Sequence, residues 1–124
     1  MNYAGSALVK HERLLVWQRS VGLSVEIYRY FASCKDYGFK DQITRSGLSI
    51  PSNIAEGVER RSDKETIHFL GIAKGSAAEL STQVLIGKNI GLIDADNSDR
   101  WRVEIIEIAA MLGGLMNKLA MASD

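Results

Sequence analysis

An apolar stripe that keeps its helical spacing across the chain's only proline is the strongest constraint on the fold. Counting from Phe39, apolar or small residues recur four, four, three, four and four residues apart and end at Val58. Residues at this spacing share one face of an α-helix, and the phase continues unbroken through Pro51. The pattern therefore predicts one kinked helix over residues 37–59. The alternative is a new helix that Ser49 caps, with the proline at an early position.

Three further segments show the same spacing, and none shows the alternation of a strand. They predict helices over about 14–33, 63–91 and 98–121. Ser62 and Glu65 form a capping box that opens the third helix. Asp96 or Ser98 would cap the fourth helix. The short connections favour an all-α, antiparallel up-down-up-down four-helix bundle.

At 124 residues the chain is long enough for one domain, expected over 13–122, after a flexible tail over 1–12. The third predicted helix is unusually rich in glycine. Each internal glycine weakens a helix by about 1 kcal/mol relative to alanine. We expect these glycines where another helix approaches closely: Gly71, Gly75, Gly87 and Gly91.

The first and fourth helices each carry two apolar stripes, although a helix in a monomeric bundle needs only one buried face. We assign the first stripe of each helix to the core: Leu14, Trp17, Val21, Val25, Tyr28 and Ala32, and Trp101, Ile105, Ile108, Leu112, Leu115 and Leu119. The second stripes predict a homo-oligomer interface at Val16, Leu23, Ile27, Tyr30, Val103, Ile106 and Met121, with Ala110 and Gly114 on the same strip. A broad core face is the alternative for the first helix.

A polar stripe runs beside the core face of the second helix. Its members are Gln42, Ser46, Ser49, Asn53, Glu56 and Arg60. Glu79 of the third helix lies next to the same face and is expected to pair with Arg45 or Asn53. The stripe is either a binding groove or a hydrogen-bond network that sets helix register, and buried polar groups more often do the latter.

The charge balance argues against a strongly basic, nucleic-acid-binding surface. Lysine plus arginine and aspartate plus glutamate both number 15, so the formal charge is zero. The balance is +3 over residues 1–35, 0 over 36–93 and −3 over 94–124. Such asymmetry can place a positive surface against a negative one in an oligomer. Arg45, Arg60 and Arg61 are candidate contacts for RNA or DNA, with a solvated turn as the alternative for the last two.

No residue pattern predicts a catalytic or cofactor site. Glu65 and His68 form the Glu-x-x-His unit that carboxylate-bridged di-iron bundles use twice, but a second copy is absent, so we expect no metal. The single cysteine, Cys34, cannot form an internal disulfide. We find no signal peptide and no uninterrupted apolar run long enough to span a membrane, and we expect a cytoplasmic protein.

The stretches LLVWQRS, YGFKDQITRSGLSIPSNIAEGVERRSDKE and FLGIAKGSAAEL occur in this order. Together they resemble the family of 23S rRNA intervening-sequence proteins, with SIPSNIAEG as a specific signature. The family typically has two basic residues after Gln-Ile, where this chain has Thr44 and Arg45. The resemblance implies an antiparallel four-helix bundle that assembles into a ring-like homopentamer. It leaves the biochemical role open, because RNA binding by the family is a proposal.

Three functional hypotheses follow, in order of preference. The first is a non-enzymatic homo-oligomeric bundle that acts as an assembly or interaction scaffold. The second is an RNA- or DNA-associated scaffold that uses a basic surface, where oligomerisation would multiply weak phosphate contacts. The third is a metal-binding bundle enzyme.

Overall fold

The computed structural model describes residues 9–122, and every regular element in that range is helical. The elements are a short 3-10 helix, η1 (Lys10–Arg13), and four α-helices, α1 (Leu15–Tyr30), α2 (Tyr37–Val58), α3 (Asp63–Asn89) and α4 (Ala95–Ala122). The all-α prediction with four helices is confirmed. Residues 10–12, which the sequence places in a flexible tail, belong to η1, where Nδ1 of His11 lies 3.1 Å from Oε1 of Glu59. Val9 precedes η1, and residues 1–8 of the predicted tail lie outside the described residues.

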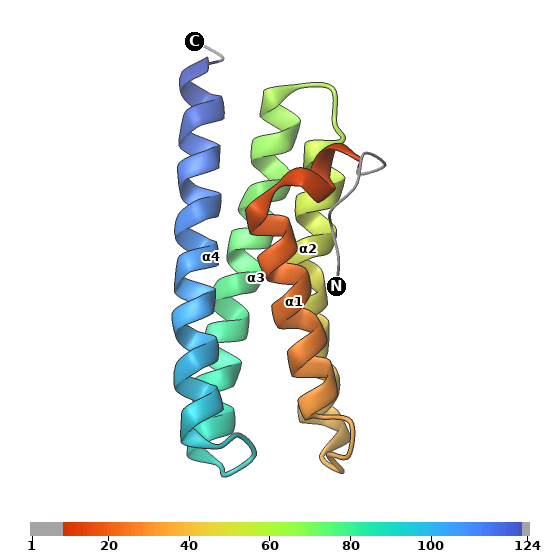
Figure 1. Cartoon of the computed structure of the whole chain (residues 1–124), viewed down its shortest axis with the longest axis vertical. Coiled ribbons are helices and arrows are strands. Elements are labelled where there is room, and N and C mark those ends of the chain that lie inside the picture. The colour runs from red at the N-terminus through yellow and green to blue at the C-terminus, as the bar shows by residue number, and fades with distance from the viewer. Residues whose placement is uncertain (1–8, 123–124) are drawn as a thin grey trace.

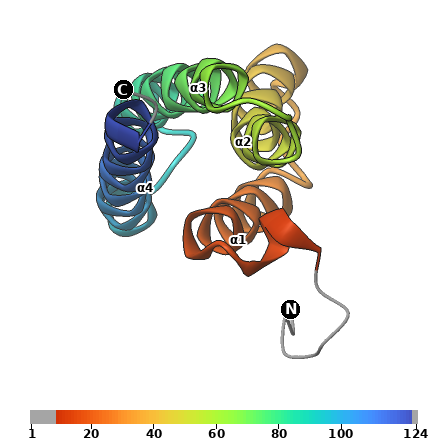
Figure 2. The same cartoon turned by 90° about the horizontal axis from the view of Figure 1, so that it is seen from above.

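Consecutive helices lie side by side and are connected at alternate ends of the molecule (Figure 1). Seen from above, α1, α2, α3 and α4 follow one another around a common centre (Figure 2). α1 has 16 residues and α4 has 28, so α4 extends well past α1 at one end. Among neighbouring helices, α1 and α4 touch each other least.

One hydrophobic core lies between the four helices. Its largest fully buried side chain is Trp101 of α4, which is 1% exposed. The aliphatic part of the core comes from all four helices: Val16, Leu23, Ile27, Ile43, Ile50, Ile54, Leu70, Leu80, Val84, Ile105, Ile108 and Leu112. The core stripe predicted for the fourth helix is therefore correct over residues 101–112.

The assignment of the two stripes of α1 is wrong in part: Leu14 and Trp17, predicted as core, do pack against the core. Val16, Leu23 and Ile27, predicted as interface residues, are buried in the core of the single chain. Tyr28, predicted as core, is 65% exposed. The core stripe includes a polar residue, Ser20, whose hydroxyl is satisfied within the helix because it donates to the carbonyl of Trp17 at 2.8 Å.

α2 runs without a break through Pro51, which is buried. The single-helix prediction is confirmed, and the alternative that starts a new helix at Ser49 is wrong. Pro51 has no N–H to donate to the carbonyl of Gly47. Two polar side chains donate hydrogen bonds to the next two carbonyls of the helix. The hydroxyl of Ser52 donates to the carbonyl of Leu48 at 2.9 Å, and Nδ2 of Asn53 donates to the carbonyl of Ser49 at 2.8 Å.

The structure decides both predicted helix starts. The hydroxyl of Ser62 accepts a hydrogen bond from the backbone N–H of Glu65 at 3.2 Å, so the Ser62 half of the predicted capping box is confirmed. The predicted caps of α4 are wrong because the helix begins earlier. Oδ1 of Asp94 accepts from the backbone N–H of Asn97 at 2.8 Å and caps the first turn. Gly91, with φ of +80°, lets the chain turn early enough for this start.

The predicted close approach at the α3 glycines holds at one of them. A β-carbon on Gly87 would lie 2.5 Å from Cδ1 of Ile93 and 2.9 Å from Cζ of Phe39. A β-carbon on Gly75 would meet nothing within 4 Å, and one on Gly71 would make only an ordinary contact with Met116. Helix contact therefore explains Gly87, backbone conformation explains Gly91, and nothing in the structure explains Gly75.

Candidate functional site

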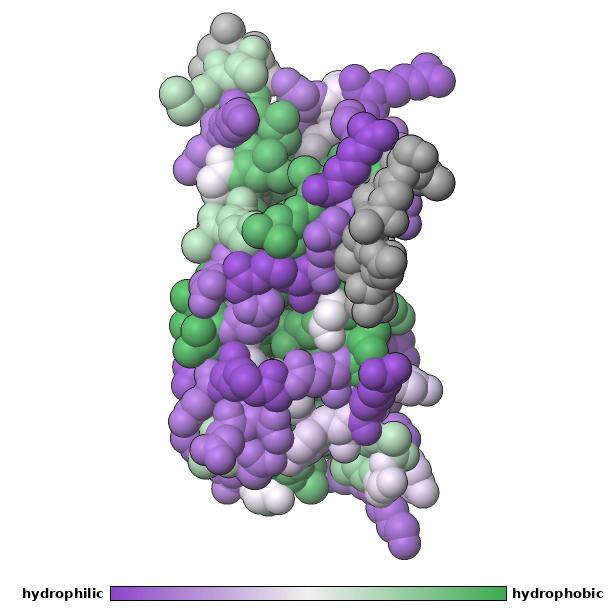
Figure 3. All heavy atoms as spheres, in the orientation of Figure 1, coloured by the Kyte–Doolittle hydropathy of each residue, from purple (hydrophilic) through white to green (hydrophobic). Residues whose placement is uncertain are grey.

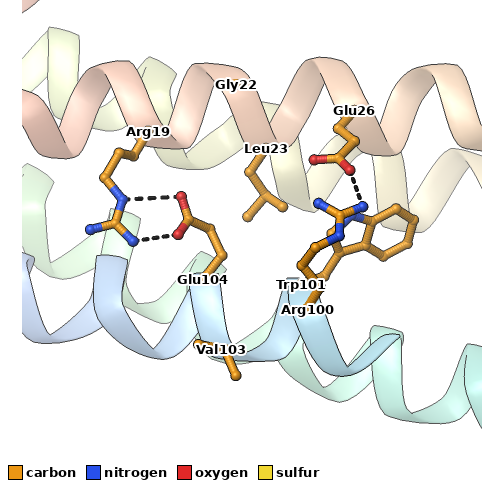
Figure 4. A pocket seen from close by; sticks show the side chains of 8 residues that line it. All are labelled: Arg19, Gly22, Leu23, Glu26, Arg100, Trp101, Val103 and Glu104. Carbon is orange, nitrogen blue, oxygen red and sulfur yellow. Dashed lines mark hydrogen bonds and ion pairs between the residues drawn. The ribbon is translucent and has the colours of Figure 1, made fainter. Parts of the chain in front are cut away.

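The seam between α1 and α4 holds a cavity of about 640 Å³ (Figure 4). Charged side chains from both helices cross it. Arg19 Nε donates to Oε2 of Glu104 at 3.1 Å, and its Nη2 binds the other oxygen of Glu104 and also Oε1 of Glu107 at 2.8 Å. Farther along the seam, Arg100 binds Glu26. The remaining lining residues are Gly22, Leu23, Trp101 and Val103.

The charged side chains of the seam are paired with one another. The carboxylates of Glu104 and Glu107 raise the pKa of Arg19 above its ordinary value. The guanidinium of Arg100 lowers the pKa of Glu26, and Glu26 in turn raises the pKa of Arg100. Because the partners of each pair come from different helices, the pairs fasten α1 to α4.

Tyr30, a predicted interface residue, serves this same connection. Its hydroxyl donates to Oδ2 of Asp94 and accepts from the backbone N–H of Asp94, both at 3.1 Å. These bonds and those of Asn97 lower the pKa of Asp94, the backbone N–H of Asn97 contributing most. Tyr30 therefore ties the end of α1 to the first turn of α4 within one chain.

The outer surface between α1 and α2 is hollowed into an apolar groove, here called the α1/α2 groove. It consists of a cavity of about 760 Å³ that continues into one of about 340 Å³, both lined by Ser24, Val25 and Leu48. Leu48 is 60% exposed. The groove is also lined by Trp17, Val21, Tyr28, Arg29, Asp41 and Arg45. The groove is thus built from the α1 stripe that the sequence assigned to the core.

The side of α4 turned away from the core carries a second apolar surface, here called the α4 outer face. Val103, Ile106 and Met121 are 57%, 61% and 76% exposed. Ala110 and Gly114 are also exposed and lie on the same stripe, whose members are three, four, four and seven residues apart. Val103 points away from α1 in Figure 4. The structure thus places these residues where a partner can reach them, and their role in an interface stays a prediction.

The apolar character of α4 extends toward its C-terminal end. By length and composition, α4 is the one helix among the described residues that is apolar enough to cross a membrane, which by itself is a weak indication. Only 17% of its most apolar 18-residue window is buried. Figure 3 shows hydrophobic surface on the part of the molecule where α4 extends past α1. The helix therefore exposes much more apolar surface than a core helix of a monomer would.

The predicted polar stripe of α2 forms a hydrogen-bond network with α3, although not with all the predicted members. The hydroxyl of Ser46 donates to Oε1 of Glu79 at 2.7 Å, so Glu79 pairs with neither Arg45 nor Asn53. The hydroxyls of Ser49 and Ser76 lie 2.8 Å apart, and Asn53 Nδ2 donates to Ser49. Gln42 is exposed, and Glu56 pairs with Arg60 outside this network. These bonds link two helices, which supports the register interpretation over a ligand groove.

The three arginines predicted as nucleic-acid contacts do not converge. Arg45 binds Asp41 at 2.9 Å, one turn away on α2. Arg60 binds Glu56 and also packs over the ring of Phe69, 4.7 Å from its centroid. Arg45 and Arg60 are about 22 Å apart along the helix direction at 1.5 Å per residue. Arg61 is exposed next to Arg60. Arg60 and Arg61 are therefore adjacent, with Arg60 paired to Glu56, and Arg45 lies apart from both.

Glu65 and His68 lie on the exposed side of the first turns of α3. The backbone N–H of Glu65 serves the helix cap, and the ring of His68 packs edge-on against Phe69 at 5.4 Å. Within residues 9–122, no three His, Cys, Asp or Glu side chains come together as a metal site would require.

Residues 12–114 match the family described as 23S rRNA-intervening sequence protein. A solved structure from Bacteroides thetaiotaomicron is similar along most of its length. It is described as a protein with unknown function from the S23 ribosomal protein family. The two share 25% identity with a TM-score of 0.77, over 82% of this chain and 98% of the other. No curated protein matches the chain.

Proposed function

Because the chain belongs to the 23S rRNA-intervening sequence protein family, we propose that it is a non-enzymatic protein whose antiparallel, up-down-up-down bundle assembles with copies of itself. The homo-oligomer acts as an assembly or interaction scaffold in the cytoplasm. A pentamer is the copy number that the family resemblance suggests. No membrane and no cofactor enter this proposal.

The exposed apolar stripe of the α4 outer face carries the proposal. Val103, Ile106 and Met121 are each more than half exposed on one side of one helix. Contiguous apolar surface of this kind on a soluble chain marks an interaction site. A second copy of the chain is the partner that the +3 charge of residues 1–35 and the −3 charge of residues 94–124 favour, since surfaces of opposite charge attract.

The charged residues of the seam support a structural role over an enzymatic one. Arg19, Glu26, Arg100 and Glu104 line the cavity between α1 and α4. Each is held by an opposite charge from the other helix. A general acid or base needs a pKa near the working pH, whereas these pairings move the pKa values of Arg19 and Glu26 away from neutrality.

The test is the mass of the native protein by light scattering, compared with two variants of equal charge change. Ile106→Arg places a cation in the α4 outer face. Ala78→Arg places one on an exposed position of α3 and serves as the control. An unpaired charge buried in an interface costs about 3 kcal/mol or more, which weakens each contact more than about a hundredfold.

We expect the native protein and Ala78→Arg to be oligomers and Ile106→Arg to dissociate at micromolar concentration. A monomeric native protein, or an Ile106→Arg variant that keeps the native mass, contradicts the proposal. Circular dichroism of each variant shows whether its helices are intact.

A further inference from the structure

We propose that the α4 outer face of one copy docks into the α1/α2 groove of the next copy, at the same height along the bundle. This inference rests on the proposed self-assembly and adds which surfaces meet and in which register. The contact is head-to-tail, because the two surfaces that meet are different parts of the chain.

The two surfaces have complementary shapes. The α4 outer face is a ridge of apolar side chains on a single helix, and the α1/α2 groove is a hollow between two helices. A helix that lays its apolar side into a groove is a common mode of recognition. Figure 2 shows α4 and the α1–α2 pair on different sides of the molecule, so one copy can offer its ridge and its groove at once.

Contacts inside one chain fix which residues of α1 and α4 are level. Tyr30 binds Asp94, Glu26 binds Arg100, and Arg19 binds Glu104. The partners run in opposite order along the two helices, so each step toward the N-terminus of α1 matches a step toward the C-terminus of α4.

From these fixed points, the levels of the groove residues follow at about 1.5 Å per residue. Arg29 is level with the turn that holds Asp96 and Asp99. Val21 is level with Val103. By the same count, Trp17 is level with the turn that holds Ile106.

In a ring whose axis is parallel to the helices, all copies stand at the same height, and residues level within one chain are level between neighbours. The apolar part of the α4 outer face then meets the apolar part of the groove. Asp96 and Asp99 continue the same stripe at spacings of three and four residues and meet the end of the groove that holds Arg29 and Arg45. Apolar surface meets apolar surface, and acidic meets basic, in one register.

The charges at that end are free to exchange partners. Arg45 and Asp41 form an exposed pair one helical turn apart, with side chains 73% and 62% exposed. Asp99 holds Lys88 only at 3.4 Å. Exposed pairs of this kind contribute little to the stability of a single chain. A neighbouring copy can therefore recruit Arg45 and Asp99 at small cost.

Disulfide trapping tests the register. In a Cys34→Ser background, Val21→Cys with Val103→Cys places one thiol in the groove and one on the ridge, on different sides of the same copy. The control is Val21→Cys with Met121→Cys, because Met121 lies eighteen residues beyond Val103, about 27 Å along α4. A disulfide needs β-carbons about 4 Å apart, so the control cannot bridge in the proposed register.

We expect mild oxidation to link the Val21/Val103 variant into covalent oligomers and to leave the control unlinked. A cross-link between two chains that carry Val103→Cys alone would show that α4 packs on itself about a two-fold axis, and would overturn the docking. An oligomer that forms neither cross-link also overturns it while the proposed function survives. A monomer in every variant contradicts both.

Charge reversal gives an independent measurement. Arg29→Glu with Arg45→Glu should dissociate the oligomer, as should Asp96→Lys with Asp99→Lys. The four changes combined should restore the native mass, since they exchange the signs of both surfaces. Failure of the combined variant to reassemble, with its helices intact, would refute the proposed charge contact.

Discussion

Replacing Gly57 by alanine should open the corner where α2 turns into α3. Gly57 is buried next to the end of α2. A β-carbon there would lie 2.6 Å from Cβ of Phe69 and 3.2 Å from the carbonyl oxygen of Thr66. Carbon atoms in contact normally stay about 3.5–4.0 Å apart, so the new methyl is about 1 Å too close. Cβ of Phe69 is bonded directly to the α3 backbone and cannot rotate away, so the two helices must separate.

The expected change in the free energy of unfolding combines two destabilising contributions and one stabilising contribution. Overpacking a core by a methyl group costs about 1–3 kcal/mol. The hydrogen bond from Oγ1 of Thr66 to the carbonyl of Gly57, 2.8 Å long, would be strained at a further cost of about 1 kcal/mol. Alanine regains less than about 1 kcal/mol of helix propensity, because the position is close to the helix end. The net prediction is a decrease of about 2 kcal/mol in the free energy of unfolding.

Gly75→Ala is the matched control in α3. No atom lies within 4 Å of the added β-carbon, so only the helix propensity changes and the variant should be more stable by about 1 kcal/mol. Guanidinium unfolding followed by circular dichroism measures both variants, at one protein concentration because self-association couples to stability. Equal stability of Gly57→Ala and the native protein, or a shift of both variants in the same direction, would refute the reasoning.

Two further predictions concern the connection between α1 and α4. Arg19→Met removes the partner of Glu104 and Glu107 and should lower the free energy of unfolding by about 1 kcal/mol at low salt; the deficit should shrink in 1 M salt if it is electrostatic. The lowered pKa of Asp94 means that its contribution to stability is complete above the ordinary aspartate pKa of about 3.9 and is lost as the pH falls through the lower folded value. Asp94→Asn should therefore unfold more easily near neutral pH and show a flatter decline in melting temperature between pH 5 and pH 2, and an unchanged slope would contradict this assignment.

Local signals were sufficient for the helices themselves. The stripe through Pro51 keeps its phase because the helix is continuous, and the cap at Ser62 involves only residues 62–65. Both features depend on neighbours in the chain. The start of α4 depended on which of several capping residues the turn would use. That choice was set by the turn at Gly91 and by Tyr30, which binds Asp94 from a distant part of the chain.

The faces of α1 could not be assigned from its own sequence, since both stripes are apolar. Trp17 and Tyr28 recur at the spacing of the stripe assigned to the core, yet both line the groove. The informative signal was the presence of two charged residues beside the other stripe. Arg19 and Glu26 are seven residues apart and face α4, which turns Leu23 into the core. That signal has meaning only once the partner residues of α4 are known.

The interface expected on α1 moves from the stripe with Val16 and Ile27 to the stripe with Trp17 and Val21. The reason for expecting an interface, a second apolar stripe on the helix, still applies. The first helix has two apolar faces, and the chain's own core buries the one with Val16 and Ile27 and only partly covers the other. The face with Trp17 and Val21 becomes the wall of a groove, and α4 has an exposed apolar face of its own. One exposed face would suit a two-fold dimer, in which a surface meets its own copy. Two different exposed faces on one chain also allow a contact between unlike surfaces, and a contact of that kind can be repeated from copy to copy until a ring closes.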